Sequence, residues 1–314
     1  MDAINIIIPK RMKGERLDAV LAKMMPDFSR SKITTAIKSG DALINGKTFK
    51  PKEKSTGLEI ITFNFSQKEN NDWLPEKIPL SIVFEDEDII VVDKQFGLVT
   101  HPGPGNWTGT LANALLYYDS NLSKVDRAGI VHRLDKNTSG LMVVAKNPKS
   151  QKYLVEQLQS HSISREYSAI VYGYMISGGS IEEPIGRDPK DRVKQAVVSN
   201  GKAAKTHIRV IDRFNSHTHV KAILETGRTH QIRVHLSYMG HSLIGDPMYG
   251  GRVRFPKKAS EDLKDSLINF KRQALHSKTL TLTHPVTGET MTWKSKLPDD
   301  MTKLLKVLKE FDSG

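Results

Sequence analysis

The polar side chains best suited to chemistry are concentrated between residues 132 and 140, which read His-Arg-Leu-Asp-Lys-Asn-Thr-Ser-Gly. An apolar, β-branched segment at 141–145 follows directly and is typical of a buried strand. A loop that leads into such a strand would hold the carboxylate of Asp135 on a rigid support, as catalysis requires. The alternative is a polar turn in which the aspartate only caps local backbone amides. The residues of the loop leave both interpretations open.

Two arginines and two histidines lie close together between residues 226 and 236; they are Arg228, His230, Arg233 and His235. Apolar residues at Ile232, Leu236 and Met239 have helical spacing, so we expect a helix of about ten residues, with Thr229 as its possible N-cap and Gly240 as its end. The arginines suit anion binding, Arg233 to a carboxylate and Arg228 to phosphate. A solvated helix face is the alternative.

Metal and nucleotide cofactors are not expected. Five residues of helix turn through about 500°, so His230 and His235 would point some 140° apart, whereas zinc-binding helices place two histidines four residues apart. The glycines near His101 do not form a dinucleotide-binding motif, because position 108 is threonine and two prolines remove backbone donors. No Walker lysine, nucleophile elbow or kinase signature is present.

The charge of the chain indicates a polyanionic partner. Its 47 basic and 35 acidic residues give a net charge of +12, which favours nucleic acid over the alternative of an anionic membrane surface. No apolar run approaches the roughly 18 residues of a membrane span, and the first residues do not resemble a signal peptide. The absence of cysteine excludes disulfides and thiol nucleophiles, and fits a cytoplasmic protein.

The first 65 residues form a basic segment with a net charge of +5. Apolar spacing predicts one helix over 17–24, ended by Pro26, and a second that Ser29 caps and Gly40 ends. A strand over 42–44, the turn dipeptide Asn-Gly and a return strand over 47–49 should follow as a hairpin. The second helix carries three basic residues beside its apolar stripe: Arg30, Lys32 and Lys38.

The polar segment 66–79 has the composition of a linker, which places a second domain at 80–314. This domain should mix helices and strands. Its expected strands lie within 89–92, 141–145 and 168–172; its expected helices include one that Ser150 caps and one near the C-terminus with apolar residues from 301 to 308.

Five segments in this second domain resemble the pseudouridine synthases of the RluA subfamily, which modify structured RNA. The first is Gly-Ile-Val-His-Arg-Leu-Asp at 129–135, and the others follow in the family's order at 165–167, 227–235, 245–247 and 272–276. The front segment from Arg16 to Lys47 resembles the S4 RNA-binding domain. One departure is Gln95, where a proline is common in the family.

The resemblance implies an α+β protein in which a small S4-like RNA-binding domain precedes the pseudouridine synthase fold, a central mixed, largely antiparallel sheet with flanking helices. It implies isomerisation of uridine to pseudouridine without cofactor or metal, by a monomer. The implied partner is ribosomal RNA or a large-subunit precursor, with the target in the 23S stem-loop that bridges the subunits.

Residue by residue, the resemblance implies that Asp135 is the nucleophile at the ribose C1′, by direct displacement or through a glycal, with addition at C6 of the base as the older alternative. Tyr167 matches the residue that stacks on the base and helps to remove the C5 proton, and Arg233 matches the basic partner of Asp135. His132 and Arg133 would help to extrude the base. The expected RNA contacts are Arg228, Arg16, Arg30, Lys32 and Lys38.

Two other functions compete with this one. A non-catalytic ribosome-binding protein with an S4-type domain would not need Asp135, Tyr167 and Arg233 together. A nucleosidase or glycosidase would also attack an anomeric carbon, but the usual type needs a second carboxyl, and none lies within five residues of Asp135. Free uracil, in place of an isomer, would identify such a hydrolase.

Overall fold

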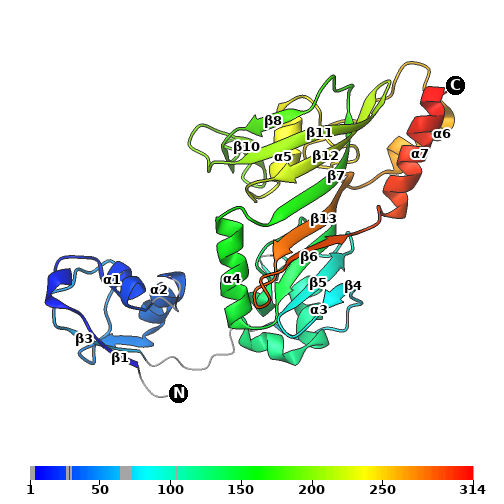
Figure 1. Cartoon of the computed structure of the whole chain (residues 1–314). Coiled ribbons are helices and arrows are strands. Elements are labelled where there is room, and N and C mark those ends of the chain that lie inside the picture. Colours follow the sequence, from blue (N-terminus) through cyan, green and yellow to red (C-terminus); the bar gives the residue numbers. More distant parts are fainter. Residues whose placement is uncertain (1–3, 26–27, 29, 64–72, 104, 314) are drawn as a thin grey trace. The chain divides into compact units, whose positions relative to one another are not determined.

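The computed structural model describes residues 4–25, 28, 30–63, 73–103 and 105–313. The chain forms two compact units, Met1–Asn70 and Asn71–Gly314 (Figure 1). Among the described residues, no helix has the length and apolar character needed to cross a membrane.

The N-terminal unit packs two helices on a small antiparallel sheet. The helices are α1 (Leu17–Met24) and α2 (Arg30–Ser39), and a short 3-10 helix, η1 (Lys10–Met12), precedes them. The sheet has the order β1-β3-β2, with β1 at Ile4–Ile7, β2 at Ala42–Ile44 and β3 at Ile60–Phe63. The apolar stripes of both helices are buried against it, as their spacing predicts. Both expected helices are confirmed, although Pro26 and Ser29 lie outside the described residues.

The expected hairpin at 42–49 forms only in its turn. Asn45 and Gly46 both have positive φ (46° and 78°), and Ile44 and Lys47 exchange backbone hydrogen bonds. The predicted return strand over 47–49 is wrong, because only a single bridge between Ile44 and Lys47 forms there. Instead, β3 pairs with β2. It also bonds the turn, where the Ile60 amide donates to the Asn45 side chain at 3.1 Å. A segment distant in sequence therefore replaces the local partner.

The second unit is built on one sheet, which has nine strands within the described residues. Its order is β4-β5-β6-β13-β7-β12-β11-β8, and β14 pairs with β13. The strands are β4 (Ile82–Glu85), β5 (Ile89–Lys94), β6 (Ser139–Ala145), β7 (Ser164–Tyr172), β8 (Gly179–Glu182), β11 (Lys205–Phe214), β12 (His217–Leu224), β13 (Leu275–Thr283) and β14 (Thr290–Lys294). Among the described strands only β6 and β13 pair in parallel, so the expected mixed, largely antiparallel sheet is confirmed.

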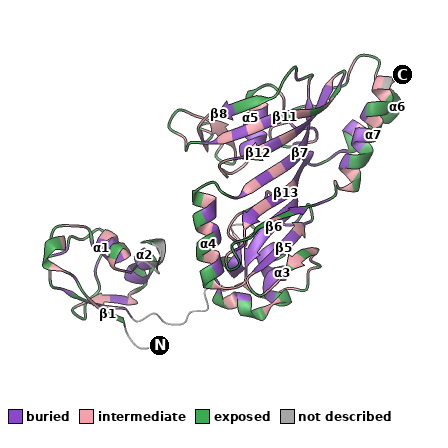
Figure 2. Cartoon of the chain, viewed as in Figure 1, coloured by how far each residue is buried: buried purple, intermediate pink, exposed green. Residues whose placement is uncertain are grey.

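Helices cover this sheet. They are α3 (Leu111–Tyr118), α4 (Pro148–Gln159), α5 (Gln231–Tyr238), α6 (Glu261–Asn269) and α7 (Asp299–Ser313), with the 3-10 helices η2 (Ser120–Lys124) and η3 (Asp126–Gly129) and the strand pair β9 (Ile185–Arg187) and β10 (Gln195–Val197). Ile90 and Val92 of β5 share a core with α3, whereas Ile89 and Val91 share another with Leu154 of α4. Burial on both faces explains the unbroken apolar run of this strand (Figure 2).

Two expected helix starts are wrong by a few residues. The cap of α4 is Asn147, whose side chain accepts the Ser150 amide at 2.9 Å, because Pro148 with its fixed φ occupies the first helical position. Thr229 does not cap α5. His230 stands there with φ of 57°, and the Gln231 side chain accepts the Arg228 amide at 2.9 Å.

The last part of the expected linker packs on the second unit. Trp73 and Ile78 contact its main core, and the Asn113 side chain donates to the Leu74 carbonyl at 2.8 Å. Residues 73–79 therefore lie against the unit that follows them in sequence. The earlier part of the linker, 66–72, lies outside the described residues.

Candidate active site

A cavity of about 590 Å³ lies in the second unit beside the loop that precedes β6. Residues from this loop, β7, the end of β12 and α5 line it. Its lining contains one carboxylate, Asp135, and five arginines: Arg127, Arg133, Arg165, Arg228 and Arg233. The structure thus brings Asp135, Tyr167 and Arg233 to one cavity whose charge suits a polyanion.

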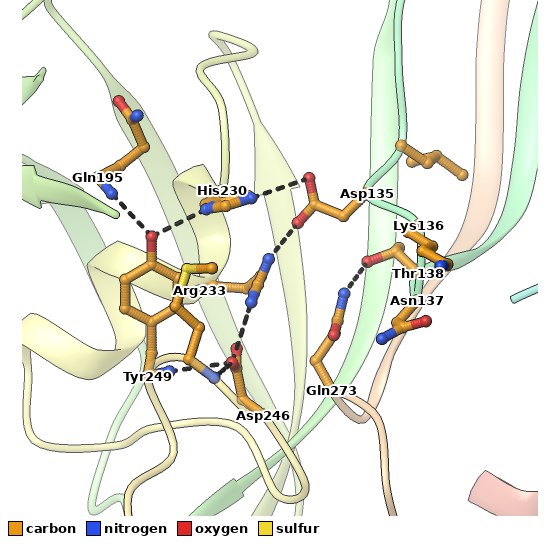
Figure 3. Close-up of polar contacts among 12 residues, drawn as sticks. Asp135, Lys136, Asn137, Thr138, Gln195, His230, Arg233, Asp246, Tyr249 and Gln273 are labelled. Atoms are coloured by element: carbon orange, nitrogen blue, oxygen red, sulfur yellow. Dashed lines mark hydrogen bonds and ion pairs between the residues drawn. The ribbon is translucent and has the colours of Figure 1, made fainter. Parts of the chain in front are cut away.

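Arg233 lies between two carboxylates (Figure 3). Its Nη1 donates to Asp135 Oδ2 at 2.9 Å, while its Nε and Nη2 donate to the two oxygens of Asp246 at 2.7 and 3.0 Å. The Asp246 side chain is fully buried and also accepts the amides of Met248 and Tyr249. Asp246 therefore fixes the plane of the guanidinium, which presents one edge to Asp135.

Both partners of this buried pair are held in their charged forms. Burial acts to raise the pKa of Asp246, but the hydrogen bonds from Arg233 and the two amides hold that pKa below its usual value. Burial acts to lower the pKa of Arg233, but Asp246 and Asp135 raise it above the usual range. A permanent cation therefore faces Asp135.

The second oxygen of Asp135 faces His230. The His230 Nε2 lies 3.8 Å from Asp135 Oδ1, and its Nδ1 lies 2.8 Å from the Tyr249 hydroxyl. That hydroxyl accepts the Gln195 amide at 3.0 Å and can donate its own hydrogen to Nδ1. Burial lowers the pKa of His230 and favours the neutral ring, whose Nε2 faces Asp135.

Buried contacts also fix the backbone of the Asp135 loop. The ammonium of Lys94, on β5, donates to the carbonyls of Leu98 at 2.8 Å, Gln95 at 3.0 Å and Lys136 at 3.3 Å. Burial lowers the pKa of Lys94 to about 7. The contacts of the Asp135 carboxylate within the described residues are with Arg233 and His230, so capping of its own loop does not account for it.

Tyr167 lies on β7, between β12 and β13, and is only 5% exposed. Burial raises the pKa of its phenol, Asp135 raises it further, and Arg165 and a hydrogen bond with Ser277 oppose this. The free protein therefore holds a protonated tyrosine in the wall of the cavity, beside the aspartate.

The other expected site residues have different surroundings. His132 and Arg133 line the cavity, and so does Arg228, whose Nε donates to the Ala203 carbonyl at 2.9 Å. His235 is buried between Thr206 and the Glu183 carbonyl, away from the contacts of His230. The two histidines therefore make no shared set of metal ligands in the part of the chain that the structure describes.

In the N-terminal unit, Arg16 and Arg30 both pair with the buried carboxylate of Asp18 at 3.0 Å, although about half of each arginine side chain is exposed. Burial acts to raise the pKa of Asp18, and these two hydrogen bonds lower it below its usual value. Lys38 is exposed, and the Lys32 side chain lies outside the description. Both arginines thus stabilise the unit itself.

Three residues of the site, Asp246, Tyr249 and Lys94, have no role that the sequence predicts. Asp246 falls in one of the segments that carry the resemblance, so a signal for it existed. Tyr249 and Lys94 act through hydrogen bonds with distant segments, and no local pattern in the sequence marks them.

Comparisons with known proteins identify the family of the chain. Residues 88–238 match the family described as RNA pseudouridylate synthase. Ribosomal large subunit pseudouridine synthase D of Escherichia coli strain K12 is 50% identical over 307 residues, which are 98% of this chain and 94% of that protein. The protein of the same name from Pseudomonas aeruginosa is 49% identical over 303 residues, 96% of this chain and 95% of that protein.

A solved structure shows the same fold. Human RNA pseudouridylate synthase domain containing 4 is 27% identical, with a TM-score of 0.57 over 73% of this chain and 93% of that chain. The expected fold class is confirmed, and so is the expected enzyme class. Since half of its residues are identical to those of such enzymes over almost its whole length, the chain belongs to the RNA pseudouridylate synthase family.

Proposed function

We propose that this pseudouridine synthase acts on large-subunit ribosomal RNA or its precursor, in the cytoplasm and as a monomer, with Asp135 as its nucleophile. The names of its relatives support the large subunit as the source of the substrate. The stem-loop of 23S RNA that bridges the subunits is the proposed target. The observation that carries the site assignment is the single carboxylate of Asp135, which Arg233 orients at 2.9 Å in a cavity with five arginines.

The reaction breaks the N1–C1′ bond of uridine, turns the uracil within the site and forms a C5–C1′ bond. Arg233 holds Oδ2 of Asp135, and Oδ1 faces His230 across 3.8 Å. We assign to Oδ1 the approach to the ribose, directly at C1′ or by promoting a glycal. Asp246 has its charge neutralised by Arg233 and takes no part in the chemistry.

The number of carboxylates favours isomerisation over hydrolysis. A glycosidase of the usual type needs a second carboxyl group about 5–9 Å from the first, as acid or base. Asp135 is the one carboxylate among the residues that line the cavity, and Asp246 is fully buried against Arg233. The lining of the cavity therefore lacks the second acid or base that such hydrolysis needs.

Tyr167 is the proposed stacking partner of the extruded uracil, with its hydroxyl taking part in removal of the C5 proton. His132 and Arg133 line the same cavity and are proposed to help the base leave its stack. Arg228 is proposed to contact the backbone of the RNA.

The N-terminal unit is the proposed S4-like RNA-binding domain. Its net charge of +5 and its exposed Lys38 support this role. About half of the side chain of Arg16 and of Arg30 is exposed while each pairs with Asp18, which supports a further contact of both with phosphate. Lys32, the other lysine of this helix segment, is also proposed to contact phosphate.

The test maps pseudouridines in ribosomal RNA from a strain that lacks the gene and from the same strain with the gene restored. We expect specific large-subunit positions to lose the modification and to regain it. Purified protein should form the same pseudouridines in unmodified large-subunit RNA. Unchanged RNA in the deletion strain would overturn the proposed substrate, and release of free uracil by the purified protein would overturn the isomerisation.

A further inference from the structure

Unpaired buried nitrogens gather in the active-site cavity. Four buried side-chain nitrogens lack a hydrogen-bond partner within the described residues, and three of them belong to residues that line this cavity: His101 Nε2, His132 Nδ1 and Arg165 Nε. Polar atoms in a protein interior are nearly always paired, because an unpaired one destabilises the folded state. Three such atoms line one cavity, and no other group of the described protein engages them, so they are available to a ligand that enters it.

The hydrogen on His132 can be located from its contacts. Its Nε2 accepts the Val143 amide at 3.1 Å, so the neutral ring carries its hydrogen on Nδ1. Burial, with Arg165 and His101 nearby, lowers the pKa of His132 to about 3, which keeps the ring neutral at physiological pH. The unpaired Nδ1 is therefore a hydrogen-bond donor.

Arg165 is a buried cation without an anion. Its residue is 5% exposed, and no carboxylate among the described residues lies within 4.0 Å of its guanidinium. The other equally buried arginines, Arg233 and Arg272, each pair with a carboxylate. Gly227 makes room for the group, since a Cβ there would lie 2.8 Å from Arg165 Nη1. The protein holds this charge in the interior at a cost in stability.

The position of Arg165 favours the base over the RNA backbone as its partner. Arg127 and Arg133 are exposed and suit phosphates, whereas Arg165 is buried. It lies two residues before Tyr167 on β7, so both side chains project from the same face of the sheet. Asp135 raises the pKa of the Tyr167 phenol and Arg165 lowers it, so the tyrosine lies within electrostatic range of both charges. A uracil stacked on Tyr167 with its ribose toward Asp135 would reach toward Arg165.

We propose that Arg165 and the His132 Nδ1 donor bind the carbonyl oxygens of the detached uracil and stabilise it as an anion. When the N1–C1′ bond breaks, its electron pair stays on N1, and the negative charge is shared with O2 and O4. On the direct path C1′ is meanwhile bonded to Oδ1 of Asp135; C5 of the anion displaces this carboxylate to form the C5–C1′ bond, C5 loses its proton and N1 gains one, so Asp135 is regenerated and the product is an isomer of uridine. This inference rests on the proposed function, and it assigns two residues to the charge that develops on the leaving base.

The test compares Arg165→Met with wild type in single-turnover reactions at saturating enzyme, on RNA with uridine or 5-fluorouridine at the target. Cleavage of the N1–C1′ bond is measured by nuclease digestion and mass spectrometry. We expect Arg165→Met to slow cleavage at uridine on the order of 10²–10³-fold, as loss of one such donor does elsewhere. Fluorine withdraws electrons and makes the base a better anion, so the loss with 5-fluorouridine should be at least about tenfold smaller.

Two more variants separate charge, position and folding. Gly227→Ala would displace the guanidinium without removing its charge, and it should slow uridine cleavage in the same direction. Arg209→Met removes an exposed arginine of β11 and should leave the rate unchanged. The melting temperature of Arg165→Met should equal or exceed that of wild type, because an unpaired buried charge has been removed.

The outcomes are distinguishable. A wild-type saturated rate for Arg165→Met, or an equal loss with both bases, would overturn the assignment. Weaker RNA binding with an unchanged saturated rate would do the same and would make Arg165 a phosphate contact. Wild-type protein that formed no pseudouridine in the uridine RNA would instead overturn the proposed function.

Discussion

Replacing Arg233 with lysine tests whether one guanidinium serves both carboxylates of the site. Arg233 makes three charge-assisted hydrogen bonds, two to Asp246 and one to Asp135. The ammonium of a lysine is a point charge and cannot span both carboxylates. If Arg233 served Asp135 alone, as the sequence suggests, Arg233→Lys would impair catalysis with little effect on folding. The structure predicts that Arg233→Lys lowers both the catalytic rate and the stability of the fold.

The size of each effect follows from the contacts. Removing one partner of a buried ion pair costs about 3–5 kcal/mol, but lysine keeps the charge and Asp246 keeps its two amide donors, so we expect a loss of about 2–3 kcal/mol. In a unit of this size that lowers the melting temperature by about 5–10 °C. Misplacement of Asp135 by about 1 Å should slow the reaction on the order of 10²-fold.

The assay is a thermal melt together with the single-turnover rate on ribosomal RNA, with Arg209→Lys as a control for an exposed arginine. A slow variant with an unchanged melting temperature would refute the anchoring of Arg233 by Asp246. A destabilised variant with a normal rate, measured below its melting temperature, would refute the orientation of Asp135 by Arg233.

Three further predictions concern other parts of the molecule. Tyr167→Phe keeps the ring and deletes the hydroxyl, so a rate loss on the order of 10²–10⁴ is expected if the hydroxyl transfers a proton, and full activity would restrict Tyr167 to stacking. Replacing Lys32 and Lys38 with alanine should reduce the slope of log affinity against log salt by about 1.4–1.8 and leave the saturated rate unchanged. Arg30 is kept in this variant because it pairs with Asp18. An unchanged slope would show that neither lysine contacts phosphate. Burial lowers the pKa of His132 to about 3 and those of His101, His217 and His276 to about 4, below the unfolded value near 6.5. The unfolded state therefore binds more protons than the folded state between about pH 4 and 6.5. In urea melts, the free energy of unfolding should fall by up to about 1.4 kcal/mol per histidine per pH unit as the pH drops through that window. Equal stability at pH 7 and pH 5 would contradict these buried environments.

The strands of the fold could be found from sequence, but their partners could not. The run that forms β5 is apolar throughout because both of its faces are buried. The parallel pairing of β6 with β13 joins residues more than 130 positions apart, and no local pattern encodes it. The hairpin at Asn45 failed for the same reason, since the distant β3 competes for β2 more effectively than residues 47–49 do.

The residues of the site that could be predicted from sequence are those whose side-chain type restricts them to a few chemical roles. Asp135 and Arg233 complement each other in charge, and the resemblance places both in matching segments. Arg165 belongs to one of those segments too, but its importance follows from burial without a carboxylate, which only the structure shows. Lys94 joins the Lys136 carbonyl of the Asp135 loop to the carbonyls of Gln95 and Leu98, and such contacts leave no trace in a sequence pattern.

The most direct test of the account replaces Asp135 with asparagine, which keeps the size of the side chain and its capacity to face Arg233 and His230 but removes its charge. The measurement is the single-turnover formation of pseudouridine in purified large-subunit RNA at saturating enzyme, with RNA affinity determined in parallel. We expect no detectable pseudouridine and an affinity within about threefold of wild type, since phosphate contacts supply most of the binding. A rate of even about one tenth of wild type would contradict the assignment of Asp135 as the nucleophile.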